Sequence, residues 1–221
     1  MDSKLQNLSS LPPQFITFEG GEGVGKSTQI SLFKQALEAQ NVKVYQTREP
    51  GGCPQAEILR SLLVEGDDSR WDGLSEALLY SAARHEHMRT TVRPALEKGQ
   101  WVISDRFVDS TTVYQGEGRG IERGELLNLH NLAIGKTWPN LTFILDIDVE
   151  EGLKRTQTRT GSAHENRFEN LDVSFHKRVR NGFLKIAREN PQRCHIINAS
   201  GTESEVHKRI MVTFLNNFNI K

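Results

Sequence analysis

The stretch FEGGEGVGKSTQ, residues 18–29, contains the spacing Gly20-x-x-x-x-Gly25-Lys26-Ser27. An apolar run at 14–20 precedes it and predicts a strand, and residues 26–40 carry apolar side chains at helical spacing. A strand before the motif and a helix after it are the context that a phosphate-binding loop requires. The glycines let backbone N–H groups converge on phosphate oxygens, and the helix N-terminus adds its dipole. This stretch therefore predicts a nucleotide-binding P-loop.

The loop also predicts individual contacts with a nucleoside triphosphate. We expect Lys26 to reach the β- and γ-phosphates and Ser27 to bind Mg²⁺. The motif alone does not separate an NTPase, a GTPase and a kinase. The residues expected to surround the phosphates are Gly20, Gly21, Glu22, Gly23, Val24, Gly25, Lys26, Ser27 and Thr28.

Short apolar runs alternate with longer amphipathic ones along the rest of the chain. Five runs predict strands, and the segments between them predict helices: 14–20, 42–47, 101–105, 141–147 and 194–199. This alternation predicts an α/β fold, a five-stranded parallel sheet with helices on both faces and ligands beyond the carboxyl ends of the strands.

The domain organisation follows from the same pattern. Residues 1–13 are polar and predict a flexible extension, and 14–221 predict a single domain. The interior segment 160–170 is polar and poorly periodic, so we expect a short mobile lid at about 155–169.

Composition narrows the class of protein. The 221 residues include 28 basic and 28 acidic side chains, a balance that argues against a nucleic-acid partner. Cys53 and Cys194 lie far apart and lack metal-ligand spacing, so we interpret them as free thiols in a reducing compartment rather than a disulfide. No apolar run has membrane-spanning length, and no signal peptide is evident. We expect a soluble cytoplasmic protein.

Two arginines predict a second phosphate site. Arg48 lies in TREPGGCP, residues 47–54, and Arg106 lies in DRFVDSTTVYQGEGRG, residues 105–120. Each follows a predicted strand, so both would face the crevice that holds the phosphate loop. Arginine is suited to gripping phosphate oxygens with two parallel hydrogen bonds. A GTPase or a motor needs no such acceptor site.

Two carboxylates accompany these arginines. Asp105 follows an apolar run and is expected to join the magnesium shell, and Glu49 is a second carboxylate nearby. A surface ion pair at a turn is the alternative for Arg48 and Glu49. A helix cap is the alternative for Asp105.

A further pair lies on the helix predicted at 75–99. Tyr80 and Arg84 are spaced i,i+4, so they share a face and could stack on a base and donate to its carbonyl. Taken alone, the pair is better explained by ordinary helix packing. His85 and His87 suggest a metal site. Side chains at i and i+2 of a helix point apart, however, so a zinc site is not the interpretation that we prefer.

Taken together, five stretches closely resemble the bacterial thymidylate kinases, a family of P-loop nucleoside-monophosphate kinases: FEGGEGVGKST, TREPGG, LLYSAAR, DRFVDSTTVYQGEGRG and LTFILDI. The resemblance extends from about Gln14 to the C-terminus. It implies a P-loop NTPase fold, ATP as donor and dTMP as acceptor, with dTDP and ADP as products. It also implies a homodimer.

The resemblance assigns the acceptor residues one by one. Arg48 and Arg106 match ligands of the acceptor phosphate, and Arg84 matches the arginine that binds thymine O4. Tyr80 stands in place of a base-stacking phenylalanine. The remaining matches concern the base edge and the sugar: Ser110 and Thr111 lie near thymine N3, Tyr114 crowds the sugar 2′ position, Gln115 belongs to the same loop, Asp105 lies near magnesium, and Glu49 lies close by.

The predicted lid resembles that of one subgroup, in which lid arginines assist transfer. The phosphate loop has Glu22 and no extra base, whereas Arg155, Arg159 and Arg167 lie in or near the lid. A solvated charged helix face is the alternative for Arg155 and Arg159. The lid reads NRFE at 166–169 where the family has a run like Asp-Arg-Ile-Glu, so a carboxylate is lost.

Two other functions compete with this one. A P-loop kinase of a different monophosphate or of a deoxynucleoside would share the loop, but two acceptor arginines favour a phosphate over a hydroxyl acceptor. A P-loop ATPase switch would need no acceptor site, and the chain lacks the Asn-Lys-x-Asp base reader of GTPases. We therefore expect Lys26, Arg48, Arg106, Arg155 and Arg159 to act in phosphoryl transfer.

Overall fold

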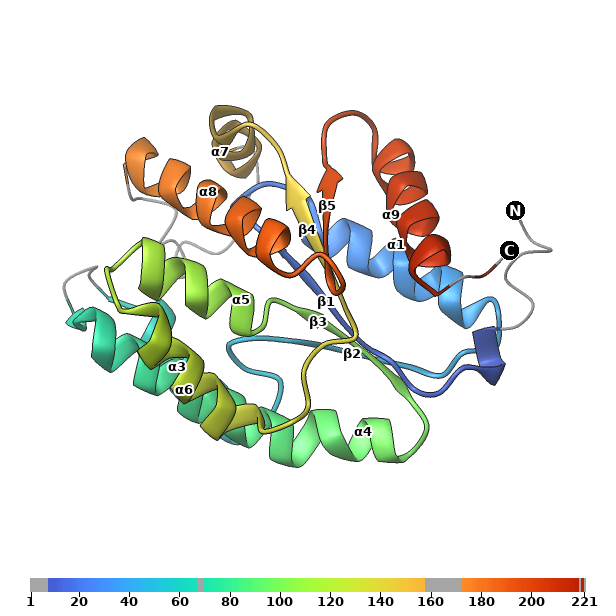
Figure 1. Ribbon diagram of the computed structural model, residues 1–221, viewed down its shortest axis with the longest axis horizontal. Helices are drawn as coiled ribbons and strands as arrows, with labels where there is room; N and C mark the ends of the chain where they lie inside the picture. Colours follow the sequence, from blue (N-terminus) through green and yellow to red (C-terminus); the bar gives the residue numbers. More distant parts are fainter. Residues whose placement is uncertain (1–7, 67–69, 158–171, 219, 221) are drawn as a thin grey trace.

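A five-stranded parallel sheet forms the centre of the molecule (Figure 1). The computed structural model describes residues 8–66, 70–157, 172–218 and 220. The strands stand in the order β2-β3-β1-β4-β5 and every neighbouring pair is parallel, which confirms the predicted sheet. Their bounds are β1 Phe15–Gly20, β2 Val44–Arg48, β3 Trp101–Asp105, β4 Leu141–Asp146 and β5 Cys194–Asn198.

Helices cover both faces of this sheet, as predicted. Helices α1 (Lys26–Glu38) and α9 (Glu203–Asn217) lie together on one face, and the opposite face is covered by α4, α5 and α8 with α3 and α6 beyond (Figure 1). The helices of this second group are α3 Gly73–His87, α4 Arg93–Glu97, α5 Val108–Thr111, α6 Arg123–Ile134 and α8 Val173–Glu189. Helix α2 (Pro54–Val64) packs on α3, and α7 (Val149–Gln157) packs on α8.

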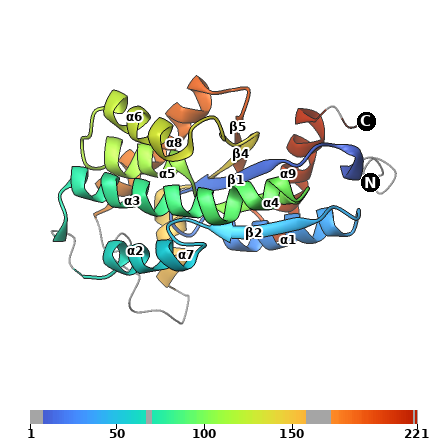
Figure 2. The same cartoon turned by 90° about the horizontal axis from the view of Figure 1, so that it is seen from below.

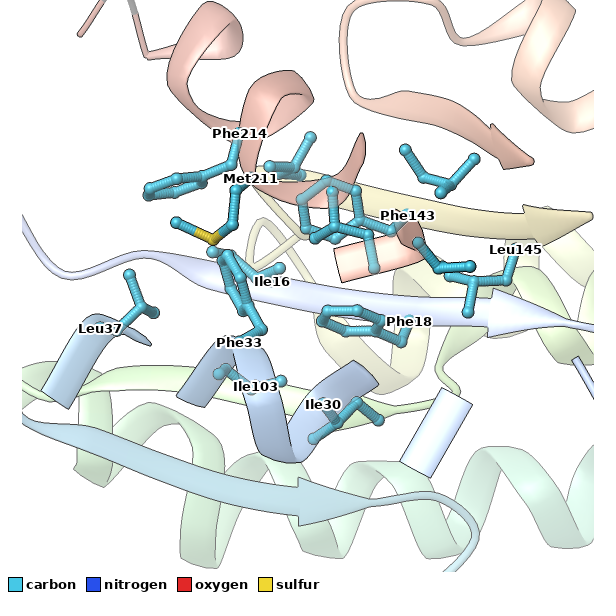
Figure 3. Close-up of a cluster of buried hydrophobic side chains, with 14 of the residues drawn as sticks. Ile16, Phe18, Ile30, Phe33, Leu37, Ile103, Phe143, Leu145, Met211 and Phe214 are labelled. Carbon is cyan, nitrogen blue, oxygen red and sulfur yellow. The ribbon is translucent and has the colours of Figure 1, made fainter. Parts of the chain in front are cut away.

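The core under α1 and α9 is aromatic. Phe33 of α1 lies 5.2 Å from Phe214 of α9 and 5.6 Å from Phe143 of β4, measured between ring centroids (Figure 3). Phe18 of β1 joins them and is fully buried. Burial of a large aromatic side chain contributes roughly 1.5–3 kcal/mol relative to exposure. This cluster therefore anchors β1 and α1, the two elements that flank the phosphate loop.

The helix predicted at 75–99 is one continuous helical run that changes its pitch (Figure 2). It begins as α3, passes through the π-helical turn η4 (Met88–Val92) and ends as α4. Pro94 lies just after the π turn. Proline has no N–H and its ring clashes with the carbonyl four residues back, so a regular α-helix cannot continue through it without adjustment. The wider turn provides that adjustment.

One element was missed in the sequence. After β3 the chain forms the short helix α5 and then the π-helical turn η5 (Thr112–Glu117). The run Ser110-Thr111-Thr112-Val113 is rich in β-branched residues, and glycines follow at 116, 118 and 120, so the segment gives no helical signal.

The described fold begins ahead of residue 14, where the single domain was predicted to start. Leu8 lies in the 3₁₀ turn η2 (Leu8–Ser10) and is fully buried in the core under α1 and α9. The predicted lid at 155–169 lies mostly outside the described residues.

Both cysteines are buried free thiols, as predicted. Among the helices that the structure describes, none is long and apolar enough to span a membrane.

Candidate active site

The phosphate loop joins β1 to α1 and needs its glycines for space as well as for conformation. Gly20 and Gly23 have positive φ values of 135° and 68°. A side chain at Gly20 would collide with the carbonyl oxygen of Leu145, and one at Gly23 with that of Gly152. Only glycine allows the loop to pass this close to the backbone of β4 and α7.

Lys26 folds back over this loop. Its Nζ donates to the carbonyl oxygens of Gly20 at 3.1 Å and Gly21 at 2.8 Å, and the residue is 9% exposed. Burial, together with the positive charge of Arg106, lowers the lysine pKa to about 8. An anion on the loop would oppose this shift, so the site favours a ligand with negative charge.

Ser27 and Asp105 bring two oxygen ligands together at the start of α1. The Ser27 hydroxyl donates to Asp105 Oδ2 at 3.4 Å. Hydroxyl and carboxylate oxygens suit Mg²⁺, which is commonly held by one or two protein ligands plus substrate phosphates. Within the described residues, no three His, Cys, Asp or Glu side chains gather as a metal site. The predicted pair therefore fits a magnesium ion shared with a nucleotide.

Arg106 sits in a strained turn that Glu19 stabilises. Arg106 has φ 67°, a left-handed conformation that costs a non-glycine residue of order 1–3 kcal/mol. The Glu19 carboxyl group accepts from the backbone N–H of Phe107 at 2.7 Å and from the hydroxyl and N–H of Ser110 at 2.6 and 3.2 Å. The turn that aims Arg106 is thus fixed by a side chain of the neighbouring strand β1.

Burial raises the pKa of Glu19 to about 8, and the nearby Asp109 charge adds to the effect. Glu19 is fully buried. The sequence analysis did not single it out. The available signal was a carboxyl side chain inside a strand of otherwise buried apolar residues.

The Arg106 guanidinium reaches the phosphate loop itself. It donates to the Gly20 carbonyl at 3.1 Å, to the Ser110 hydroxyl at 3.1 Å and to Glu22 Oε1 at 2.8 Å. It also lies over the ring of Tyr114, 5.2 Å from the centroid. The second predicted phosphate ligand and the donor loop are therefore in direct contact.

Glu22 faces the acceptor side of the site. Its Oε1 accepts from Arg106 and, at 2.9 Å, from the hydroxyl of Tyr114. Burial opposes ionisation, but the charges of Arg106 and Lys26 outweigh it and lower the pKa of Glu22 to about 2. Glu22 is therefore a fixed negative charge at neutral pH.

Arg84 is held inside the protein by three acceptors. Its Nε donates to Glu49 Oε2 at 2.7 Å, and its Nη2 donates to the Phe107 carbonyl at 3.1 Å and the Thr111 hydroxyl at 3.0 Å. The residue is 2% exposed, and its remaining nitrogen, Nη1, is buried without a hydrogen-bond partner. A buried, unpaired guanidinium nitrogen is costly unless a ligand supplies an acceptor.

Glu49, expected close to Asp105 and among the substrate-binding residues, points into the protein interior. It is 5% exposed, and its two carboxylate oxygens accept from Arg84 and His87. His87 is fully buried between Glu49 and Thr47, whereas His85 contacts the carbonyl of Ala133. The two histidines diverge, in agreement with the rejection of a zinc site.

Arg48 lies on the surface beside α2. Its Cα pairs with that of Asp105 in the sheet register, which places it at the predicted edge. Its side chain is 54% exposed and pairs with Glu57 at 3.1 Å. The structure therefore shows Arg48 in a surface ion pair, which was the alternative to a phosphate-binding role. The partner is Glu57 in place of Glu49.

The other predicted substrate residues lie around this crevice. Thr111 is buried beside Arg84, and Tyr80 lies one helical turn before Arg84 on α3, partly buried. Gln115 donates to Glu76 Oε2 of α3 at 3.1 Å, which ties η5 to α3. Glu76 is fully buried, and neither the sequence pattern nor the motifs indicated its role.

The predicted lid arginines are only partly described. Arg155 near the end of α7 donates to Glu151 at 2.6 Å and to the Ala199 carbonyl at 3.4 Å. Arg159 and Arg167 lie outside the described residues. The pairing of Arg155 with a carboxylate one turn away is what a solvated helix face would show.

These features define a class of enzyme. A phosphate loop with its lysine lies in direct contact with Arg106, and the buried Arg84 lies beside Thr111 between α3 and α5, an arrangement that suits a P-loop kinase acting on a nucleotide. Comparison with known proteins narrows the class. The family model for thymidylate kinase matches residues 18–210. The chain belongs to the thymidylate kinase family, whose reaction is the ATP-dependent phosphorylation of dTMP to dTDP.

Individual relatives agree with the family model. A thymidylate kinase of Magnetococcus marinus is 52% identical over 84% of this chain and 88% of its own length. One of Nitrobacter winogradskyi is 46% identical over 89% of this chain and 86% of its own. The crystal structure of thymidylate kinase from Ehrlichia chaffeensis is similar with a TM-score of 0.74 and 37% identity, covering 92% of this chain and 99% of that one.

Proposed function

We propose that this site transfers the γ-phosphoryl group of ATP to dTMP, with Mg²⁺, and releases dTDP and ADP. The contact between Arg106 and the Gly20 carbonyl carries the proposal, because it places a phosphate-binding arginine against the donor loop. A donor and an acceptor phosphate bound on the two sides of this contact would be neighbours. The comparisons support dTMP as the acceptor.

Lys26 and Arg106 are the proposed centres of charge neutralisation. On nucleotide binding, Lys26 exchanges its loop carbonyls for the β- and γ-phosphates, and Arg106 exchanges Glu22 for the acceptor phosphate. Arg48 turns from Glu57 to the acceptor phosphate, and Arg155 and Arg159 approach the transferring group from the lid. Such exchange is favourable because an arginine–phosphate pair forms two charge-assisted hydrogen bonds.

Ser27 and Asp105 are the proposed protein ligands of Mg²⁺. Their oxygens lie at the mouth of the phosphate loop, where a bound ion would neutralise charge on the β- and γ-phosphates. The loop residues Gly20 to Thr28 supply backbone N–H groups for the same phosphates.

Arg84 is the proposed reader of the acceptor base. Its unpartnered Nη1 can donate to thymine O4, and its neighbour Thr111 lies where the N3 edge of the base would be. Tyr80, on the same face of α3, would stack on the ring. Tyr114 would crowd a ribose 2′-hydroxyl, with Ser110, Gln115 and Glu49 supporting the wall of the pocket.

The proposed mechanism needs no general base. A nucleoside monophosphate has its second pKa near 6, so at neutral pH it is largely a dianion and already a nucleophile. Catalysis then consists of positioning two phosphates in line and neutralising the charge between them. The lid at about 155–169 would close to exclude water.

A homodimer is also proposed, with α3 and α6 at its centre. The two helices pack together and expose four leucines, 48–79% accessible: Leu74, Leu78, Leu127 and Leu132. Such a patch of exposed apolar side chains indicates a protein interface.

We place the protein in the cytoplasm, where Cys53 and Cys194 would stay reduced.

The decisive experiment is a coupled ADP-release assay with ATP, Mg²⁺ and one monophosphate at a time. Strong turnover with dTMP, weaker turnover with dUMP and little with UMP, CMP, AMP or GMP is the expected result. The matched control is Lys26→Ala with dTMP, which should lose turnover and keep its fold. ADP release that does not depend on any acceptor would overturn the proposal in favour of an ATPase.

A further inference from the structure

A chain of four buried polar side chains links β2 to α3. Thr47 Oγ1 lies 2.7 Å from His87 Nε2, His87 Nδ1 lies 2.9 Å from Glu49 Oε1, and Arg84 Nε donates to Glu49 Oε2 at 2.7 Å. All four residues are between 0% and 9% exposed. The proposed function uses Arg84 and Glu49 and assigns no role to Thr47 or His87.

The first three resemble the hydroxyl–histidine–carboxylate arrangement of a hydrolase, but no substrate can approach the hydroxyl. Gly52 lies directly against it: a side chain on Gly52 would collide with Thr47 Oγ1 and lie 2.5 Å from His87 Nε2. A nucleophile must present its oxygen to an open site. This row of four side chains is therefore closed to substrate at Thr47, and it can act only through Arg84 at its other end.

The hydrogen-bond donors and acceptors fix a direction along the chain. The Glu49 carboxylate can only accept, so His87 Nδ1 must donate to it. In the neutral ring, Nε2 then carries no proton and accepts a hydrogen bond from the Thr47 hydroxyl. Each of the two Glu49 oxygens thus has one side-chain donor, and His87 and Arg84 together prevent the carboxylate from rotating.

Arg84 receives its orientation from this carboxylate. A planar guanidinium has its nitrogens in a fixed fork, so pinning Nε and Nη2 determines where Nη1 points. Nη1 is the Arg84 nitrogen that has no hydrogen-bond partner among the residues that the structure describes. An error in the Glu49 position therefore moves the one donor that remains for a ligand.

We infer that His87 is a positioning residue for acceptor-base selection, which holds Glu49 and thereby aims Arg84 Nη1 at the base. This inference rests on the proposed function, since it takes Arg84 as the base reader. His87 itself touches no substrate. Without its Nδ1–H, Glu49 Oε1 is buried without a side-chain donor, and the carboxylate is free to turn and take Arg84 with it.

The test compares dTMP with dCMP, because cytosine carries an amino donor at the position of thymine O4 and cannot accept from Arg84. For His87→Leu, we expect the KM for dTMP to rise about 10- to 100-fold, the loss associated with one charge-assisted hydrogen bond. The KM for ATP should stay unchanged. The ratio of kcat/KM for dTMP over dCMP should fall about 10-fold or more.

A second pair of variants keeps the inference testable if His87→Leu does not fold. Thr47→Val removes the hydroxyl that holds the far side of the imidazole and keeps the side-chain shape, whereas Thr47→Ser restores a hydroxyl. We expect Thr47→Val to lower the dTMP/dCMP ratio in the same direction as His87→Leu and Thr47→Ser to return it toward the wild-type value. Equal ratios in the two Thr47 variants would contradict the inference.

The matched control is His130→Leu. His130 is 2% exposed and its Nε2 lies 2.9 Å from a threonine hydroxyl, that of Thr112, but it does not contact Glu49. It should lose stability as His87→Leu does and keep the wild-type dTMP/dCMP ratio.

The outcomes separate the inference from the proposed function. A wild-type enzyme without preference for dTMP would overturn the proposed function and the inference with it. A wild-type preference that His87→Leu retains would overturn the inference alone.

Discussion

The guanidinium of Arg106 and the carboxylate of Glu22 lie 2.8 Å apart, so the arginine proposed to bind the acceptor phosphate forms an ion pair within the protein. Both side chains are about one-fifth exposed. On the proposed function, an acceptor phosphate would displace Glu22 from Arg106, and Glu22 would keep the hydroxyl of Tyr114 as its donor. The strained backbone turn at Arg106 is held separately, by the hydrogen bonds of Glu19.

Replacing Arg106 should abolish most turnover. We expect Arg106→Ala to lower kcat about 10³-fold, because the arginine stabilises charge in the transition state. Arg106→Lys should rescue little, since an ammonium cannot form two parallel hydrogen bonds. ADP release with saturating substrates measures the effect, and circular dichroism checks the fold. The control is Arg188→Ala on α8, an exposed residue far along the helix; near-normal turnover of Arg106→Ala would refute the role.

Glu22 should make the protein sensitive to acid. Its folded-state pKa of about 2 lies below the unfolded value of 4.5, so its stabilisation is complete above pH 4.5 and is lost as the pH falls toward 2. Urea unfolding of wild type and Glu22→Gln should show wild type losing about 2 kcal/mol more free energy of unfolding between about pH 6 and about pH 3. Parallel curves for the two proteins would contradict this.

Lys26 should set the upper pH limit for ATP capture. With a pKa of about 8 in the free enzyme, Lys26 loses its charge above that pH. We expect kcat/KM for ATP to fall about tenfold per pH unit above about pH 8. At saturating ATP the bound phosphates raise the lysine pKa, so kcat should stay flat over the same range. A flat kcat/KM profile to pH 10 would exclude this assignment.

The ion pair between Arg193 and Asp109 should matter for stability and little for chemistry. Arg193 forms two 2.7 Å hydrogen bonds with the nearly buried Asp109 and stacks on Trp138. Arg193→Met leaves a buried carboxylate without its cation and should cost about 3–5 kcal/mol of unfolding free energy. Arg193→Met combined with Asp109→Leu should cost less.

The control for that pair is an exposed one. Arg123 and Glu189 are 57% and 35% exposed, so Arg123→Met should cost less than about 1 kcal/mol in the same urea titration. Equal losses for Arg193→Met and Arg123→Met would show that burial does not control the strength of these pairs.

The leucines on α3 and α6 should control the oligomeric state. Leu78 is 50% exposed near the middle of α3. Leu78→Glu would bury a charge in an apolar interface, so we expect a monomer by sedimentation velocity where wild type is a dimer. Val212→Glu on α9, with a side chain 46% exposed on the opposite face of the sheet, is the control. A Leu78→Glu dimer would move the interface elsewhere.

The sheet and the phosphate loop could be predicted because both depend on local pattern. Four of the five strands are short and mostly apolar, β2 being more polar, and the loop combines glycine spacing with a strand and a helix. The helix at α5 and the turn η5 could not be predicted, because Glu19 caps α5 from another strand. A cap that distant in sequence leaves no local signal.

The site, like the fold, combines residues that local motifs indicate with contacts that depend on distant elements. The motifs named Lys26, Arg84 and Arg106; in the structure Lys26 and Arg106 both contact the Gly20 carbonyl, and Arg84 is buried beside Thr111. They did not indicate that Glu49 would pair with Arg84 and His87, because that depends on how α3 packs beside the end of β2. Nor did they show Arg48 paired with Glu57, since the pairing depends on how α2 packs beside β2.

The helical run from α3 through η4 to α4 carries two different surfaces on one stiff rod. Leu78 faces solvent and Arg84, less than two turns later, faces the interior. If two copies associate through these leucines, the arginine proposed to read the base lies on the same helix that contacts the neighbouring protomer. A tilt of that body would shift recognition of the acceptor and contact between protomers together, so the two properties would have to evolve together.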